Sequence, residues 1–107
     1  MISETFEIKI YQDKNGKKPF VDWLESLPDK KARAKIKVRL TRLRLGNLGD
    51  WKSLSGGLYE IRIDEGKGYR LYFTQDQSKK NILLGGSKKT QTKDINKAKE
   101  YLKDYRS

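Results

Sequence analysis

Two neighbouring segments in the middle of the chain alternate between apolar and polar residues. Residues 57–64 and 68–73 both show this period of two, which is typical of strands with one buried face, and glycines lie in the connection between them. The pattern therefore predicts a hairpin. Its apolar face carries Tyr59, Ile61, Ile63, Tyr69, Leu71 and Phe73. Its polar face carries Glu60, Arg62, Asp64, Arg70 and Tyr72. We expect this polar face to be the working surface.

The preceding part of the chain predicts one strand and two helices. Residues 6–11 alternate strictly, which favours a first strand. Pro19 suits the first turn of a short helix whose apolar residues recur at helical spacing, and Pro28 ends that helix. Asp29 is then a suitable N-cap for a longer helix that runs to about Leu45.

The remaining part predicts one more strand and a final helix. A polar turn over residues 76–80 precedes the apolar run 81–84, which indicates a strand buried on both faces. A polar segment, residues 85–91, leads to helical periodicity over residues 92–106. We therefore predict one α+β domain over residues 1–107, in the order β-α-α-β-β-β-α. A small antiparallel sheet would pack on the two N-terminal helices, with a C-terminal helix added.

The charge of the chain indicates an anionic partner. There are 25 Lys and Arg against 14 Asp and Glu, giving a formal net charge of +11. Eight of these cations lie in residues 30–44, which contain no acid. Like charges one helical turn apart repel by roughly 0.2–0.5 kcal/mol per pair, so a polyanion such as nucleic acid or the ribosome would relieve a real cost. A solvated helix face is the alternative explanation. Within this run, Lys37 and Arg44 are the candidate RNA contacts.

Two residue types are missing, and their absence limits the chemistry. The chain has no cysteine, which excludes disulfides and thiolate metal sites. It has no histidine, the commonest metal ligand and the usual acid or base at neutral pH. No apolar run approaches the roughly 18 residues of a membrane span, and no signal-peptide core is visible. We expect a cytoplasmic protein without a metal, a cofactor or a membrane partner.

Several segments, taken in order, resemble the RelE/ParE toxin superfamily. Within it they are most similar to the HigB-like branch, the phage-derived or addiction module killer proteins. The similarity runs from about Phe6 to Tyr101. It is carried by Gly-Leu-Tyr-Glu-Ile-Arg-Ile (57–63), Gly-Tyr-Arg-Leu-Tyr (68–72), Gly-Gly-Ser-Lys-Lys-Thr-Gln-Thr-Lys-Asp-Ile (85–95), Pro19-Phe20 with Trp23-Leu24, and Leu45-Gly46-Asn47 before Asp50.

The resemblance implies a RelE-like fold and a toxin of a type II toxin–antitoxin module. Such a toxin would be a metal-independent endoribonuclease that cleaves mRNA on the ribosome. Its partners would be mRNA, the ribosome and a helix-turn-helix antitoxin of the HigA-like kind. Two alternatives stay open at this point. One is a ParE-like inhibitor of DNA gyrase, and the other is a catalytically degenerate member that only binds nucleic acid or antitoxin.

The resemblance also implies catalytic residues. Arg62 matches a basic position of the first hairpin strand, Arg70 the arginine after Gly-Tyr, and Lys88 the basic residue after the last strand. Asp94 falls where some relatives carry a tyrosine, and Glu60 departs from a lysine. A further departure is the serine at position 87, where the HigB-like branch usually has an acid.

Chemistry gives these residues roles in cleaving RNA. Arg62 and Arg70 suit phosphate, because a guanidinium can hold two of its oxygens at once. Without histidine, Glu60 or Asp94 is the easiest base. Each has a structural alternative, since Glu60 could pair with a neighbouring arginine and Asp94 could favour a helix dipole. The candidate RNA contacts near the hairpin are Lys52, Lys89 and Tyr72, the last by stacking on a base.

Overall fold

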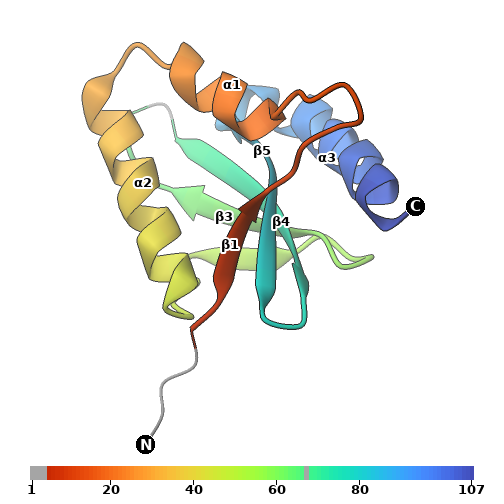
Figure 1. The fold of residues 1–107 in the computed structure, drawn as a ribbon. Coiled ribbons are helices and arrows are strands. Elements are labelled where there is room, and N and C mark those ends of the chain that lie inside the picture. Colours follow the sequence, from red (N-terminus) through yellow and green to blue (C-terminus); the bar gives the residue numbers. More distant parts are fainter. Residues whose placement is uncertain (1–4, 67) are drawn as a thin grey trace, which may run out of the picture.

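The computed structural model describes residues 5–66 and 68–107. Its centre is a five-stranded sheet in the order β1-β5-β4-β3-β2 (Figure 1). The strands are β1 (Glu7–Ile10), β2 (Trp51–Ser53), β3 (Tyr59–Ile63), β4 (Tyr69–Asp76) and β5 (Lys79–Ser87). The predicted hairpin is formed by β3 and β4, which pair antiparallel. Lys67, in the predicted connection between them, lies outside the described residues.

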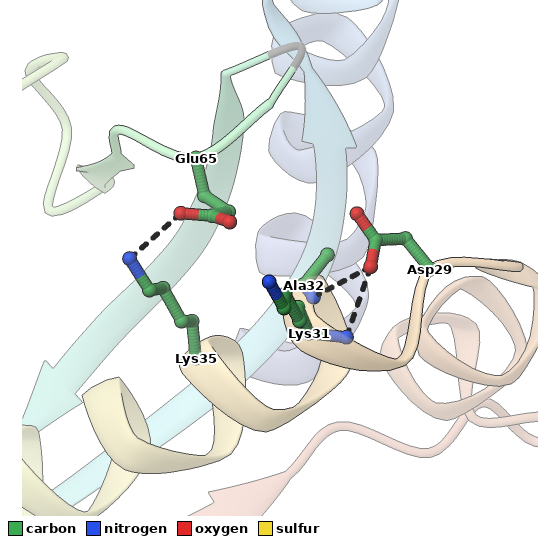
Figure 2. A network of polar contacts seen from close by, with 5 residues as sticks. All are labelled: Asp29, Lys31, Ala32, Lys35 and Glu65. Atoms are coloured by element: carbon green, nitrogen blue, oxygen red, sulfur yellow. Dashed lines mark hydrogen bonds and ion pairs between the residues drawn. The ribbon is translucent and has the colours of Figure 1, made fainter.

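Three helices cover the sheet. They are α1 (Pro19–Ser26), α2 (Lys30–Arg44) and α3 (Gln91–Arg106), and a 3-10 turn over Lys88–Thr90 precedes α3. In Figure 1, α2 and α3 lie on opposite sides of the sheet. The predicted starts of the first two helices are confirmed, with Pro19 in the first turn of α1 and Asp29 as the N-cap of α2. The Asp29 carboxylate accepts hydrogen bonds from the backbone N–H groups of Lys31 and Ala32, at 2.9 and 3.4 Å (Figure 2).

One hydrophobic core lies between the sheet and the two N-terminal helices. The predicted apolar face of the hairpin faces this core. Phe20 of α1 and Ile36 of α2 are fully buried against it, and Trp23 is partly buried there. The alternation of residues along β3 and β4 therefore placed the correct side chains on this face. The other buried members of this core are Ala32, Leu43, Ile61, Ile63, Tyr69, Leu71, Phe73 and Ile82.

A second core lies on the opposite face, under α3. Ala98 and Leu102 of α3 are buried there against Leu83 and Leu84 of β5, together with Tyr72 of β4. The predicted burial of residues 81–84 on both faces is confirmed. The face that carries Glu60, Arg62 and Arg70 is thus partly covered by a helix, because α3 brings its own apolar stripe to it.

Three details of the predicted sheet are wrong. Residues 51–53 form an additional strand, so the order contains one more β element than expected. The sheet is mixed, because β1 pairs parallel with β5 while the other pairs are antiparallel. The predicted polar turn shortens to residues 77–78, since β4 and β5 extend through Asp76 and from Lys79. Within the described ranges no helix is long and apolar enough to cross a membrane.

Candidate active site

The pairing of three strands places two arginines and a glycine side by side. Arg62 of β3 is opposite Arg70 of β4, which is opposite Gly86 of β5. Two residues further along these strands, and therefore on the same face, Glu60 is opposite Tyr72. Because residues directly opposite in a sheet have Cβ atoms about 4.5–5.5 Å apart, this register brings the two guanidinium groups to one place.

A cleft of about 230 Å³ opens beside this row. Three of the predicted catalytic residues line it, namely Arg62, Arg70 and Lys88. The Arg62 side chain is 43% exposed, whereas Arg70 is buried except for 9% of its surface. The backbone N–H of Lys88 donates to the carbonyl of Gly68 at 2.9 Å, which fixes Lys88 beside the start of β4. The cleft therefore combines one buried guanidinium group, one half-exposed guanidinium group and one exposed ammonium group.

Two carboxylates that the sequence did not single out as catalytic also line this cleft. They belong to Asp50 and Asp64, and both residues are exposed. The carbonyl of Asp50 accepts the backbone N–H of Arg62 at 2.8 Å, so Asp50 is held against β3. Asp64 follows Arg62 by two residues, and this alternation was the sequence signal for it. Asp50 lies in the loop before β2, where no periodicity marks it.

Glu60 is fully buried and has polar partners on two sides. Its Oε2 accepts a hydrogen bond from Nε2 of Gln91 at 2.8 Å, and its Oε1 lies 3.6 Å from Nε of Arg62. The alternative in which Glu60 pairs with an arginine is therefore the one observed. Gln91, the first residue of α3, fixes this carboxylate. A carboxylate enclosed in this way orients Arg62 and has no exposed oxygen for a substrate proton.

Tyr72 is also fully buried, which corrects the expectation that its ring stacks on a base. Burial raises the pKa of its hydroxyl well above the ordinary value, and the negative charges of Glu60 and Asp94 add to the effect. The alternation of residues along β4 correctly predicted the face on which Tyr72 lies. It could not predict that α3 covers this face.

Asp94 lies over Gly86, at the end of the arginine row. A Cβ atom added to Gly86 would be 1.8 Å from Oδ2 of Asp94, so only glycine leaves room for this carboxylate. The hydroxyl of Thr90 donates to the same oxygen at 2.5 Å. Asp94 does not line the cleft of Arg62 and Arg70. It lines a neighbouring cavity of about 630 Å³.

The other predicted RNA contacts are spread over the surface. Lys52 is exposed on β2, opposite Glu60 in the register. Lys89 is exposed in the 3-10 turn, next to Lys88. Lys37 and Arg44 are exposed on α2, which packs on the opposite face of the sheet. The structure thus brings three of the five predicted catalytic residues to one cleft, with Glu60 buried beside Arg62 and Asp94 at the neighbouring cavity, and it leaves the two α2 cations apart from them. In the part of the chain that the structure describes, no three His, Cys, Asp or Glu residues are grouped to hold a metal ion.

The fold and the site together define a class of protein. A small α+β domain with a five-stranded sheet, three helices and two paired arginines at one end of the sheet is consistent with the RelE-like fold. The chain belongs to the family of phage derived proteins that are Gp49-like (DUF891), whose family model matches residues 22–103. This family is a RelE-like toxin family of addiction modules, and membership implies an antitoxin partner. The match covers every residue of the cleft and of the arginine row.

A related protein comes from Haemophilus influenzae and is described as an uncharacterized protein. The two chains are 51% identical over 81 residues, which is 75% of this chain and 82% of the relative. The description of this relative names no activity. It adds no residue role.

Proposed function

We propose that this protein is the toxin of a type II toxin–antitoxin module of the HigB-like branch, and that it cleaves mRNA on the ribosome without a metal ion. The observation that carries the proposal is the convergence of Arg62, Arg70 and Lys88 on one cleft. Three cations around a small cleft provide the field that a phosphodiester requires. A helix-turn-helix antitoxin of the HigA-like kind would hold the toxin inactive.

The reaction begins when the 2′-oxygen of a ribose attacks the adjacent phosphorus. The P–O5′ bond breaks, and the products are a 2′,3′-cyclic phosphate and a free 5′-hydroxyl. Negative charge grows on the phosphoryl oxygens during this step. Arg62 and Arg70 stabilise that charge, because Arg62 is held by its ion pair with Glu60 and Arg70 is buried beside it. Removing one such donor from an enzyme typically lowers the rate by about 10²–10³-fold.

Two proton transfers accompany the attack. The carboxylates of Asp50 and Asp64 line the cleft and are exposed, so one of them accepts the proton of the 2′-hydroxyl. The Lys88 ammonium group, also on the cleft, gives a proton to the departing 5′-oxygen. Glu60 acts indirectly, since its contact with Arg62 orients that side chain. General acid and base catalysis of this kind contributes roughly 10²–10⁴-fold.

The test uses purified protein, translating ribosomes and a defined mRNA. We expect the wild type to cut the message and Arg62→Gln and Lys88→Gln to cut it at least about 100-fold more slowly. Lys14→Gln is the matched control, because Lys14 is exposed in the loop before α1 and lines neither the cleft nor the adjacent cavity. Asp50→Asn and Asp64→Asn identify the proton acceptor, which is the carboxylate whose loss lowers the cleavage rate by roughly 10²–10⁴-fold.

Two results would overturn the proposal. One is an uncut message, and the other is equal cutting by the wild type and by Arg62→Gln. A DNA supercoiling assay with gyrase runs alongside. Inhibition of supercoiling by a protein that leaves mRNA intact would assign the ParE-like function instead. Circular dichroism of each variant confirms that lost cleavage does not come from lost folding.

A further inference from the structure

The cavity of about 630 Å³ beside the catalytic cleft is not used in the proposed reaction. It lies between the end of α1, the start of α3 and the end of β5. Tyr69 lines both this cavity and the cleft, so the two are adjacent. Its volume is within the range of about 300–1,000 Å³ typical of small-molecule sites. Its lining residues are Trp23, Leu27, Pro28, Asp29, Gly66, Tyr69, Gly86, Ser87, Thr90 and Asp94.

The charges of the two sites are opposite in kind. The cleft carries two arginines and a lysine against the two carboxylates of Asp50 and Asp64, so its lining is net positive, whereas among residues 5–66 and 68–107 no Lys or Arg lines the cavity. The cavity instead carries the carboxylates of Asp29 and Asp94. A phosphate is therefore attracted to the cleft and repelled from the cavity. A neutral nucleobase with N–H donors, joined to that phosphate through the sugar, is instead attracted to the carboxylates of the cavity.

The walls of the cavity are aromatic and fixed. A Cβ on Gly85 would lie 2.1 Å from Cε3 of Trp23, so the indole ring rests directly on the β5 backbone. The ring of Tyr69 meets Trp23 edge to face, with centroids 6.1 Å apart. Aromatic side chains of this kind contribute about 1–3 kcal/mol per nucleic-acid base by stacking. Trp23 is only partly buried, which leaves part of its ring for a ligand.

The hydrogen-bonding groups select among bases. An ionised carboxylate only accepts hydrogen bonds, and it has about four lone-pair positions. Thr90 uses one of these on Asp94. The Asp29 carboxylate is already engaged with the first turn of α2. Guanine presents two adjacent donors, N1–H and the N2 amino group, which match a carboxylate in bidentate fashion. Adenine and cytosine present one amino group beside an acceptor, and uracil a single N–H between two carbonyl groups.

We infer that this cavity binds a guanine base of the RNA substrate, with Asp94 accepting from N1–H and N2–H and with Trp23 and Tyr69 as its aromatic walls. The inference rests on the proposed function, since the phosphate next to that base would occupy the cleft of Arg62 and Arg70. It gives Asp94 a role in base selection instead of proton transfer. The toxin would then prefer messages that carry guanine beside the scissile phosphate.

The first experiment measures binding without cleavage. A Trp51→Phe protein leaves Trp23 as the single tryptophan, so its fluorescence reports on the cavity. We expect guanosine 3′-monophosphate to quench it and to bind about 5- to 150-fold more tightly than uridine 3′-monophosphate. Inorganic phosphate alone should not quench. In Asp94→Asn the preference should fall to near unity, because the amide presents its own N–H donors to guanine. Glu100→Gln, on an exposed part of α3, is the matched control and should keep the preference.

The outcomes separate this inference from the proposed function. Equal binding of both nucleotides, no quenching by either, or a preference unchanged in Asp94→Asn would overturn the guanine site. Active cleavage of mRNA with no preference for guanine would also overturn it while leaving the nuclease in place. Selective binding of guanosine 3′-monophosphate by a protein that never cuts mRNA would support the site and refute the nuclease.

Discussion

Substituting Gly86 by alanine tests the most tightly packed contact of the site. A methyl group there would lie 1.8 Å from Oδ2 and 2.6 Å from Cγ of Asp94, well inside van der Waals contact. The carboxylate must therefore move by more than 1 Å or so, and its hydrogen bond with Thr90 is lost. Overpacking typically costs about 1–3 kcal/mol, and removing a glycine returns roughly 0.4–1 kcal/mol through the unfolded state. We expect Gly86→Ala to lower the free energy of unfolding by about 1–2 kcal/mol.

A double-mutant cycle isolates this contact. In an Asp94→Ala background the carboxylate is gone, and the Cβ of residue 94 lies 3.4 Å from the added methyl group, an ordinary contact distance. Gly86→Ala should then be neutral or slightly stabilising. The cycle should give a coupling of about 1–3 kcal/mol between the two positions. Urea unfolding followed by tryptophan fluorescence measures all four proteins.

The result that would refute this reasoning is an equal cost of Gly86→Ala in both backgrounds. It would mean that the cost comes from the strand and not from Asp94. Gly85→Ala serves as the comparison, because its added methyl group would meet the Trp23 ring at 2.1 Å. Its cost should not change when Asp94 is replaced.

Three further predictions concern stability. The pKa of Tyr72 is higher in the folded protein than its unfolded value of about 10, so its contribution to stability is complete below about pH 10 and is lost as the pH rises further. Tyr72→Phe should therefore flatten the alkaline decrease in the free energy of unfolding measured with urea. Asp29→Ala removes the N-cap of α2 and should cost about 1 kcal/mol by the same measurement, a value near zero counting against the cap. Lys35→Gln breaks the ion pair with Glu65, which is drawn in Figure 2 and joins atoms 2.7 Å apart, and should cost less than about 1 kcal/mol because the Lys35 side chain is largely exposed.

The sequence was sufficient for most of the fold because its strands and helices carry strong periodic patterns. It was not sufficient for β2, whose three residues are all exposed and show no alternation, so that only pairing with the edge of β3 makes them a strand. It also did not show that β1 pairs parallel with β5. A period of two identifies the face of each side chain but not the neighbouring strand.

The sequence was also sufficient for part of the site, but not for which of its side chains are buried. Arg62, Arg70 and Lys88 were named from the sequence, and the structure lines one cleft with them. Tyr72 and Glu60 were placed on the correct face but were expected to be accessible. Tyr72 is buried with Ala98 and Leu102 of α3, and Glu60 accepts a hydrogen bond from Gln91 of the same helix. These are tertiary contacts that no local pattern contains.

The buried polar cluster is itself an argument that this face has a function. Glu60 is completely buried, its Oε1 has only the 3.6 Å ion pair with Arg62, and Nε of Arg70 is buried without a hydrogen-bond partner among the described residues. Each such atom costs about 1–3 kcal/mol, which is a large fraction of the total stability of a small domain. Apolar residues of similar size would often be neutral or more stabilising at such positions. Stability given up at buried polar groups is typical of functional sites, so this cluster supports the proposed role of the face that carries Arg62 and Arg70.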